Sequence, residues 1–287
     1  MKSLRQYILE AREAKRAIGH FNVSNTEMIS GVFNAAKKLN TAVIIGLSEG
    51  ERDFVGVHQS VALVRSLRDK FDFPVFINAD HTYSLDRVCE AIDAGFDSVI
   101  FDGAKLSFEE NVEVTKQCVD YAKKSGRDVL VEGELGFIGQ SSKVLDSIPD
   151  GVDLDSGLTL PLVAKQFVEE TGVDLFAPAV GNFHGMLRGG RDPNLNTERI
   201  SEIKQTINAP LVLHGASGNS DADIQNAIKE GISIVHVSTE IRVAYRKALA
   251  LSLQENPDEV APYKILPKAE NAVYEVVKRR LELFGKL

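Results

Sequence analysis

Short apolar runs rich in β-branched residues recur along the chain at intervals of roughly 25 to 40 residues. Continuous runs of this kind are typical of strands that are buried on both faces of a parallel sheet. The runs are Arg16–Phe21, Ala42–Leu47, Val75–Asn78, Ser98–Phe101, Val129–Val131, Leu175–Val180, Leu211–Leu213 and Ile234–Val237. The pattern therefore predicts eight strands.

Segments with a helical period of apolar positions lie between these runs. They are Thr26–Leu39, Ser84–Ala94, Ser107–Lys124, Pro161–Glu170, Thr197–Ile207 and Asp221–Glu230, and a last helix is predicted over Pro267–Leu287. Ser107 and Glu110 fit a capping box at the start of one helix, and Gly95 and Gly231 stand where two others should end.

Strands that alternate with helices predict a parallel sheet with crossover helices, and eight such units close into a (β/α)8 TIM barrel of the α/β class. An open doubly wound sheet is the alternative, but the chain has no GxGxxG fingerprint. No Pro/Gly/Ser-rich linker divides the sequence, so we expect residues 1–287 to form one domain. The exception to short connections is Gly136–Gly157, and a loop of this length is usually functional or mobile.

The composition permits a sizeable core, since 44% of residues are hydrophobic and 26% are charged. The net charge of −8 argues against nucleic acid as the main partner, because phosphate-backbone binding needs a basic face. Cys89 and Cys118 form no CxxC pair, so no disulfide framework is expected. We see no signal peptide and no apolar run long enough for a membrane span, and we expect a cytoplasmic protein.

Polar residues follow all eight strand-like runs, at the end of the barrel where active sites of this fold lie. They are Asn22, Ser48, Glu49, Asp80, His81, Asp102, Glu132, Glu134, His184, His214, Ser238 and Thr239. A barrel with only a structural role does not need carboxylates and imidazoles at this end. The sequence therefore predicts an active site here.

Three of the six histidines follow strands: His81, His184 and His214. Three imidazoles with one open position are the signature of a catalytic zinc site. A single histidine of this kind is more often a core or surface residue, but three at one end of a barrel indicate a metal. His20 and His58 have no such context, and we expect both to be structural.

Carboxylates accompany these histidines. Asp80 directly precedes His81, and it is interpreted as a proton-transfer group, with a loop-fixing role as the alternative. Asp102, Glu132 and Glu134 are further candidate ligands. The two glutamates are two residues apart and point to the same face of a strand, so one could bind metal while the other orients a neighbour.

Two segments have the small residues of phosphate-binding loops. The first is His214–Gly218 after the seventh strand, and the second is His236–Thr239, which ends the eighth strand and opens a helix. These two loops often hold phosphate in barrels of this fold, because small residues and helix N-termini offer N–H groups. Gly185 and Gly215 would also let the backbone approach a ligand closely.

Taken together, these motifs resemble the class II, metal-dependent fructose-bisphosphate and tagatose-bisphosphate aldolases, over nearly the whole length. The matching blocks are Gly19–Asn25 (GHFNVSN), Ile45–Gly50 (IGLSEG), Asn78–His81 (NADH), Ala94–Gly103 (AGFDSVIFDG), Glu132–Gly136 (EGELG), Gly181–Gly185 (GNFHG), Pro210–Gly218 (PLVLHGASG), Gly231–Arg242 and Glu282–Gly285. The resemblance implies reversible cleavage of a ketose bisphosphate, fructose 1,6-bisphosphate in the first instance, to dihydroxyacetone phosphate and an aldehyde.

The resemblance also implies a role for each matching position. His81, His184 and His214 correspond to ligands of a catalytic Zn²⁺, Asp102 and Glu134 to ligands of a second or displaced metal ion, and Asp80 to the catalytic acid/base. Substrate is implied to contact Asn22, Ser48, Gly185, Gly215, Ala216, Ser217, His236, Val237, Ser238 and Thr239. Relatives of this class are commonly homodimers or homotetramers, so an oligomer is expected.

The chain departs from the family pattern in places. His236 stands where an asparagine is usual in the eighth-strand motif, and Gly139-Gln140-Ser141-Ser142 replaces a loop element with a glutamate; the nearest acids are Asp146, Asp150 and Asp153. After the fourth strand, Ala104 replaces a serine. Arg279 and Arg280 on the last helix are candidates for a second phosphate, with a solvated helix face as the alternative.

These departures concern the substrate and leave the metal ligands intact. Three other functions stay open at this point. The chain could prefer tagatose bisphosphate or another phosphorylated ketose, it could bind sugar phosphate without turnover, or it could be a metal-dependent hydrolase on the same barrel.

Overall fold

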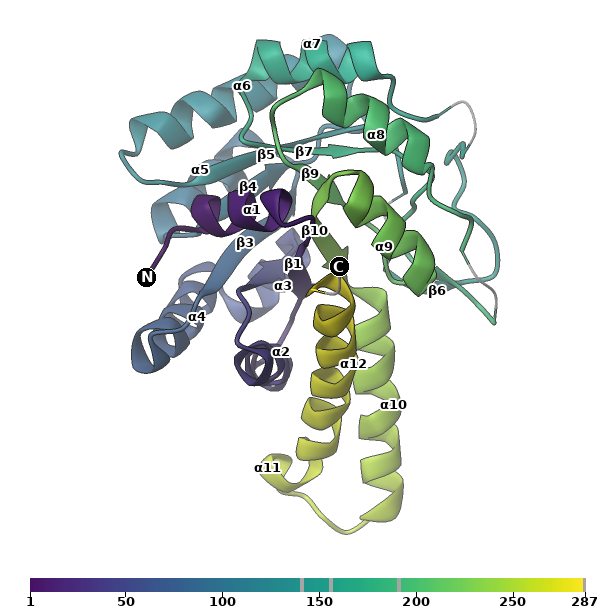
Figure 1. Cartoon of the computed structure of the whole chain (residues 1–287). Coiled ribbons are helices and arrows are strands. Elements are labelled where there is room, and N and C mark those ends of the chain that lie inside the picture. Colours follow the sequence, from purple (N-terminus) through teal and green to yellow (C-terminus); the bar gives the residue numbers. More distant parts are fainter. Residues whose placement is uncertain (140–141, 155–156, 190–191, 286–287) are drawn as a thin grey trace.

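A closed barrel of parallel strands forms the centre of the computed structural model, which describes residues 1–139, 142–154, 157–189 and 192–285 (Figure 1). The strands are β1 (Ile18–Asn22), β2 (Val43–Leu47), β3 (Val75–Thr82), β4 (Ser98–Phe101), β5 (Leu130–Leu135), β7 (Leu175–Pro178), β9 (Leu211–Leu213) and β10 (Ile232–Val237). They pair in the order β1-β10-β9-β7-β5-β4-β3-β2, so β1 closes the barrel against β10. The predicted (β/α)8 fold is confirmed, and the open sheet is excluded.

Amphipathic helices surround the barrel, and the sequence pattern predicts all of those below except the one over Val57–Phe71. They are α2 (Thr26–Leu39), α4 (Val57–Phe71), α5 (Leu85–Ala94), α6 (Phe108–Lys124), α7 (Pro161–Thr171), α8 (Thr197–Thr206), α9 (Asp221–Glu230) and α12 (Pro267–Gly285). The Ser107–Glu110 capping box opens α6, and Gly95 ends α5 in a left-handed conformation. Cys89 and Cys118 are free, as expected. The main core lies between these helices and the outer side chains of the strands.

One end of the barrel is covered by α1 (Leu4–Glu13), a helix that the sequence pattern did not single out. Leu4 and Ile8 of α1 pack on Ile18, Ile44 and Ile234, which lie at the N-terminal ends of their strands. A Ser3–Gln6 capping box starts the helix, and that signal was available in the sequence. Because α1 closes this end, the C-terminal ends of the strands are left for a site.

Further elements lie outside the regular strand–helix units. The long connection after β5 contains β6 (Val144–Leu145), which pairs with β8 (Met186–Leu187) from the loop after β7. A short helix, α3 (Glu49–Val55), follows β2 directly. After β10, α10 (Thr239–Glu255) and α12 lie side by side and project from the barrel, with α11 (Pro262–Ile265) between them (Figure 1). Of the helices described, none combines the length and the apolar character that crossing a membrane requires.

Candidate active site

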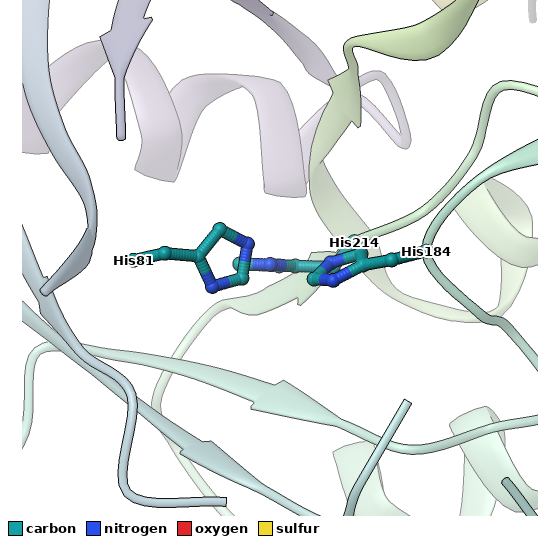
Figure 2. A group of neighbouring side chains, drawn as sticks. All are labelled: His81, His184 and His214. Carbon is teal, nitrogen blue, oxygen red and sulfur yellow. The ribbon is translucent and has the colours of Figure 1, made fainter. Parts of the chain in front are cut away.

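Three imidazoles meet at the C-terminal end of the barrel. His81 lies near the end of β3, His214 follows β9, and His184 lies in the loop after β7. One ring nitrogen from each lies within 4.8 Å of the others. Figure 2 shows His81 approaching from the side opposite to His184 and His214, with its ring turned toward them. The rings of His81 and His184 are perpendicular, with centroids 4.5 Å apart. The three predicted metal ligands are therefore brought together.

A bulge at the end of β3 explains how neighbouring residues reach the same site. Side chains of successive strand residues normally point to opposite faces. Ala79 of β3 pairs with Val99 of β4, and Thr82 pairs with Phe101, so β3 has one more residue than β4 between these pairs. His81, within this bulge, has a left-handed φ of 39°. The extra residue changes the direction in which the following side chains point, as bulges beside active sites do. Asp80 and His81 consequently both line the cavity.

Each imidazole is oriented by a hydrogen bond from one of its ring nitrogens to a neighbouring carbonyl or carboxylate oxygen. His184 Nδ1 lies 3.0 Å from the carbonyl oxygen of Gly139, and His214 Nε2 lies 2.8 Å from Glu132 Oε1. His81 Nδ1 lies 3.0 Å from Asp102 Oδ2. Such partners fix the tautomer and the ring orientation of metal-binding histidines. The arrangement leaves Nε2 of His184 and Nδ1 of His214 free to bind an ion.

The donor set fits a bound cation. His214 Nδ1 and Glu134 Oε2 are buried and have no hydrogen-bond partner among the described residues. Burial, aided by the charge of His81, lowers the pKa of His184 to about 3 and that of His214 to about 4, so both offer neutral rings. Burial also acts to lower the pKa of His81, but Asp80, Asp102 and Glu134 outweigh it and raise the pKa to about 10. The site therefore stabilises positive charge.

A second group of possible ligands shares His81 with the first. Ligand atoms of His81, Asp102 and Glu134 also lie within 4.8 Å of one another. Asp102 is itself fixed by the backbone N–H of Ala104, which donates to Oδ1 at 3.2 Å. The two predicted carboxylates are thus placed where an ion could be held beside the three-histidine position.

Asp80 is buried between an amide and two imidazoles. Asn22 Nδ2 donates to Asp80 Oδ2 at 2.7 Å, while Asp80 Oδ1 lies 3.6 Å from His236 Nδ1 and 3.8 Å from His81 Nε2. Burial acts to raise the pKa of Asp80, but the charge of His81 and the contact with His236 outweigh it and hold the pKa well below its ordinary value. Asp80 is therefore an ionised carboxylate with one oxygen available.

The three histidines and Asp80 open into a cavity of about 280 Å³. Its wall includes most of the residues predicted to contact substrate: Asn22, Ser48, Gly185, Gly215, Ser217, His236, Ser238 and Thr239. Ala216 and Val237 instead pack into the core and do not line it.

Gly215 has a φ of 66°, and a Cβ there would lie 2.2 Å from the carbonyl oxygen of Phe183, so the turn needs glycine. Ser217 Oγ accepts the backbone N–H groups of Ser238 and Glu240, both at 3.3 Å. The loop that contains Gly215 and Ser217 therefore meets the residues that follow β10 at the N-terminus of α10. A helix N-terminus with free N–H groups favours the binding of an anion.

Sequence reasoning missed three charged residues beside the cavity. Glu51 on α3 accepts from Asn22 Nδ2 at 3.1 Å and from the backbone N–H of Ser48 at 2.9 Å, and Arg242 of α10 donates to its other oxygen. Arg52 is 1% exposed, and its Nη1 donates to the carbonyls of Leu47 and Asp80. The Ser48–Glu51 capping box was a usable signal for Glu51. The sequence contains no comparable signal for Arg52, because a charged residue on an amphipathic helix usually faces solvent.

Several other candidates lie away from the cavity. Arg280 is buried and pairs with Glu240 and Asp221, and its Nη2 lies 3.4 Å from the carbonyl oxygen of Ser217, so it supports the phosphate-type loop from behind. Asp146 pairs with Arg188 on the surface. Asp146, Asp150, Asp153 and Arg279 do not line the cavity. In the altered loop, Ser142 does line it, whereas Gln140 and Ser141 lie outside the described residues.

The remaining two histidines differ from each other. His58 is exposed on α4, in keeping with its expected lack of a site role. His20 is buried directly behind His236, and the two rings are stacked. No sequence pattern indicates this contact, because it joins the first strand of the barrel to the last.

Comparison with known proteins agrees with this geometry. Residues 2–287 match the family model "Fructose-bisphosphate aldolase class-II". A fructose-bisphosphate aldolase from Staphylococcus epidermidis is 37% identical over 286 residues, which cover 99% of this chain and 96% of the relative. A probable fructose-bisphosphate aldolase from Bacillus subtilis is 36% identical, with 99% and 97% covered.

Solved structures show the same similarity. The YdjI aldolase from Escherichia coli K12 superimposes with a TM-score of 0.81 at 33% identity, covering 99% of this chain and 98% of that one. A putative fructose-1,6-bisphosphate aldolase from Coccidioides immitis has a TM-score of 0.83 at 28% identity, with 98% and 95% covered. The chain belongs to the class II fructose-bisphosphate aldolase family and is a metal-dependent lyase that acts on a phosphorylated sugar.

Proposed function

We propose that this protein uses Zn²⁺ to cleave fructose 1,6-bisphosphate reversibly into dihydroxyacetone phosphate and glyceraldehyde 3-phosphate. The observation that carries the proposal is the convergence of three imidazoles beside an ionised Asp80, in a cavity that is also lined by a phosphate-type loop pair. The printed names of the relatives support the choice of substrate.

His81, His184 and His214 would hold the metal, since they form a three-nitrogen set that is closed on the outer side by Asp102, Gly139 and Glu132. Three imidazoles and an open position are typical of catalytic zinc. When bound, the ion polarises the ketone carbonyl as a Lewis acid. Asp102 and Glu134, with His81, would provide a place for a second divalent ion.

Asp80 would take the proton from the hydroxyl on the carbon that becomes the aldehyde. Its Oδ2 is pinned by Asn22, and its Oδ1 has no hydrogen-bond partner among the described residues, so one oxygen is available to a substrate hydroxyl. As that proton leaves, the carbon–carbon bond breaks and its electron pair moves to the fragment with the ketone. Protonation of this fragment gives dihydroxyacetone phosphate.

The phosphate of dihydroxyacetone phosphate would bind at Gly215, Ser217, Ser238 and Thr239, with Gly185 opposite them. The buried Ser238 Oγ has no partner among the described residues, and the N-terminus of α10 provides N–H groups. Asn22, Ser48 and His236 would contact the remaining hydroxyls. Ala216 and Val237 would act by holding the backbone of these loops.

A different ketose is the second candidate substrate. The supporting observation is His236, which lines the cavity 3.6 Å from Asp80 and is larger than the asparagine usual at this position. An imidazole there changes both the space and the hydrogen bonding offered to the substrate. Tagatose bisphosphate, which differs from fructose bisphosphate at one hydroxyl-bearing carbon, is the first alternative to test.

The protein would act as a homodimer or homotetramer. In support, Leu251, Val260 and Tyr263 are exposed on the projecting α10–α12 hairpin, at 49%, 87% and 76%. Apolar side chains gathered on a projecting element are typical of association surfaces. Light scattering of the purified protein measures the assembly directly.

The proposed activity is tested by coupling triose phosphate formation to NADH oxidation, with fructose 1,6-bisphosphate as substrate. We expect activity that a chelator removes and that added Zn²⁺ restores. Tagatose 1,6-bisphosphate is assayed in parallel, and a higher kcat/KM for it would favour the second candidate. Metal-loaded protein that binds these sugars but cleaves neither would instead indicate a relative that binds without turnover.

A further inference from the structure

A row of three stacked imidazoles runs from the cavity into the barrel interior: His214 and His236 line the cavity, and His20 lies behind them. His20 on β1 and His236 on β10 are register partners where the barrel closes. Their rings are nearly parallel, at 5°, with centroids 3.5 Å apart. On its other side, His236 stacks on His214, with centroids 4.1 Å apart and an angle of 21°. His20 does not line the cavity, so its effect on the substrate is indirect. A ring nitrogen of His20 lies within 4.8 Å of a ring nitrogen of His236 and of a carboxylate oxygen of Asp80, and His236 is the ring on which it stacks.

The ring of His20 is itself held on two sides. Its Nε2 lies 3.2 Å from Asn78 Oδ1, and Asn78 Nδ2 donates to Ser98 Oγ at 2.7 Å. Because the amide nitrogen is used by Ser98, the amide oxygen accepts, and His20 Nε2 is the donor. A Cβ on Gly46 would lie 2.1 Å from His20 Cε1, so glycine at that position makes the room for the ring. β1, β2, β3 and β4 together fix this imidazole.

A packing role alone does not require an imidazole at this position. His20 Nδ1 is buried without a hydrogen-bond partner among the described residues, and an unpaired buried polar atom destabilises the folded state. An apolar side chain would avoid this cost. In return, the imidazole of His20 provides a flat ring that stacks on His236. Its hydrogen bond to Asn78 sets the angle of the His20 ring.

The plane of His236 matters because its edge faces the catalytic carboxylate. His236 Nδ1 lies 3.6 Å from Asp80 Oδ1, the oxygen that Asn22 leaves free. If His236 rotated, both the space beside Asp80 and the surface offered to the substrate would change. His214, at the other end of the row, is already fixed by Glu132.

We propose that His20 is a positioning residue of the aldolase reaction: by stacking on His236 it holds that ring edge-on to Asp80, and so sets the geometry at the carbon that becomes the aldehyde. This inference rests on the proposed function, in which Asp80 accepts the hydroxyl proton. His20 itself touches neither substrate nor metal.

The test compares His20→Ala with His20→Phe, which keeps a flat ring. In His20→Ala we expect kcat for fructose 1,6-bisphosphate to fall between about tenfold and a hundredfold, since small displacements at a reacting centre have effects of this size. KM should change little, because the phosphate loops do not contact His20. His20→Phe should recover most of the lost kcat. His58→Ala, a change of the same type at an exposed position, should match the wild type.

A second readout follows the stack without turnover. With histidine labelled in its ring, the NMR signals of His236, assigned from His236→Asn, should lose the ring-current shift from His20 in His20→Ala and keep most of it in His20→Phe. Metal content measured on the same samples should equal that of the wild type.

Two failures are distinguishable. A wild-type protein with metal that cleaves no ketose phosphate would contradict the proposed function, whatever His20 does. An active wild type with an equally active His20→Ala, or a kcat loss in His20→Ala that follows metal content or folded fraction, would overturn the positioning role alone.

Discussion

At the scale of single residues, the proposed mechanism separates the groups that would hold an ion from the group that would move a proton. Asp80 is oriented by Asn22 and His236. It does not belong to the group of possible metal ligands formed by His81, His184 and His214. Glu132 does not line the cavity. Of the three histidines, it forms a hydrogen bond with His214. These two carboxylates should therefore respond differently to substitution.

Asp80→Asn keeps the shape of the side chain and removes its capacity to take a proton. We expect kcat to fall by about 10² to 10⁴, the usual contribution of a positioned acid/base. Bound metal, measured by atomic absorption, should stay at the wild-type level. His214→Ala is the comparison and should lose metal. Normal activity in Asp80→Asn would remove Asp80 from the mechanism.

Glu132→Leu removes the acceptor that orients His214 while keeping the site filled. Loss of such an orienting partner typically weakens metal affinity by about 10- to 100-fold. Glu132→Gln keeps an acceptor oxygen and should retain most of the affinity. Titration with a competing chelator measures both variants. Equal affinities in Leu and Gln variants would show that His214 needs no orienting partner.

Which site residues the sequence could reveal depended on how local their signal was. His81, His184 and His214 were predictable because each follows an apolar run, and the ends of barrel strands converge whatever the details of packing. His20 was interpreted as structural because its partner, His236, is far away in sequence. Arg52 is not predictable, because it lies on α3 and donates to carbonyls of β2 and β3. An arginine in a helical sequence pattern does not reveal such long-range hydrogen bonds.

At the scale of elements, the end of β3 is the most constrained part of the barrel. It contains a bulge and a left-handed histidine, and both need support from neighbours. Arg52 supplies this support from α3, since it bonds Leu47, Asp80 and Thr82. A short helix thus ties the ends of β2 and β3 together.

Arg52→Met keeps the length of the side chain and leaves the carbonyls of Leu47 and Asp80 without their donor. The expected loss of unfolding free energy is about 2 to 6 kcal/mol, because each of the two unsatisfied buried carbonyls costs about 1 to 3 kcal/mol. Arg188→Met, which breaks an exposed and solvent-screened pair with Asp146, should change the unfolding free energy far less. Denaturant unfolding compares the two. Similar values would mean that Arg52 is not a structural tie.

The α1 helix should matter for stability through a single face. Ile8 is 1% exposed and packs into the N-terminal end of the barrel, whereas the adjacent Leu9 is 43% exposed. We expect Ile8→Ala to lower the unfolding free energy by about 2 to 5 kcal/mol. Leu9→Ala should change it by less than about 0.5 kcal/mol. The same unfolding experiment applies, and equal effects would contradict the packing of α1 described above.

Elements were predictable where the pattern was long and regular. The strands and most of the outer helices follow from apolar runs and from caps such as Ser107 and Gly95. The pattern placed the end of β3 at Asn78, while the strand continues to Thr82, because a bulge depends on its neighbours rather than on propensity. The two-residue strands β6 and β8 pair only with each other, and segments so short have no periodicity to detect.

At the scale of the whole molecule, the metal should stabilise the folded chain, because its ligands come from β3, β7 and β9 regions that converge only on folding. A ligand that binds only the folded state stabilises it by about 4 kcal/mol at a thousandfold excess over Kd. Chelation should therefore lower the Tm of the wild type by several degrees. In His214→Ala the Tm should be insensitive to chelator, as scanning calorimetry can establish. An unchanged wild-type Tm would argue against a buried metal.

The pairing of β1 with β10 also has a consequence for synthesis. His20 and Phe21 are synthesised more than two hundred residues before their register partners His236 and Val237. Until the last strand arrives, the nascent chain has an open edge at β1 and half of a phosphate loop pair. A chain halted before residue 232 therefore has no complete substrate pocket, because His236, Ser238 and Thr239 line that pocket. Activity should appear only when β10 docks between β1 and β9.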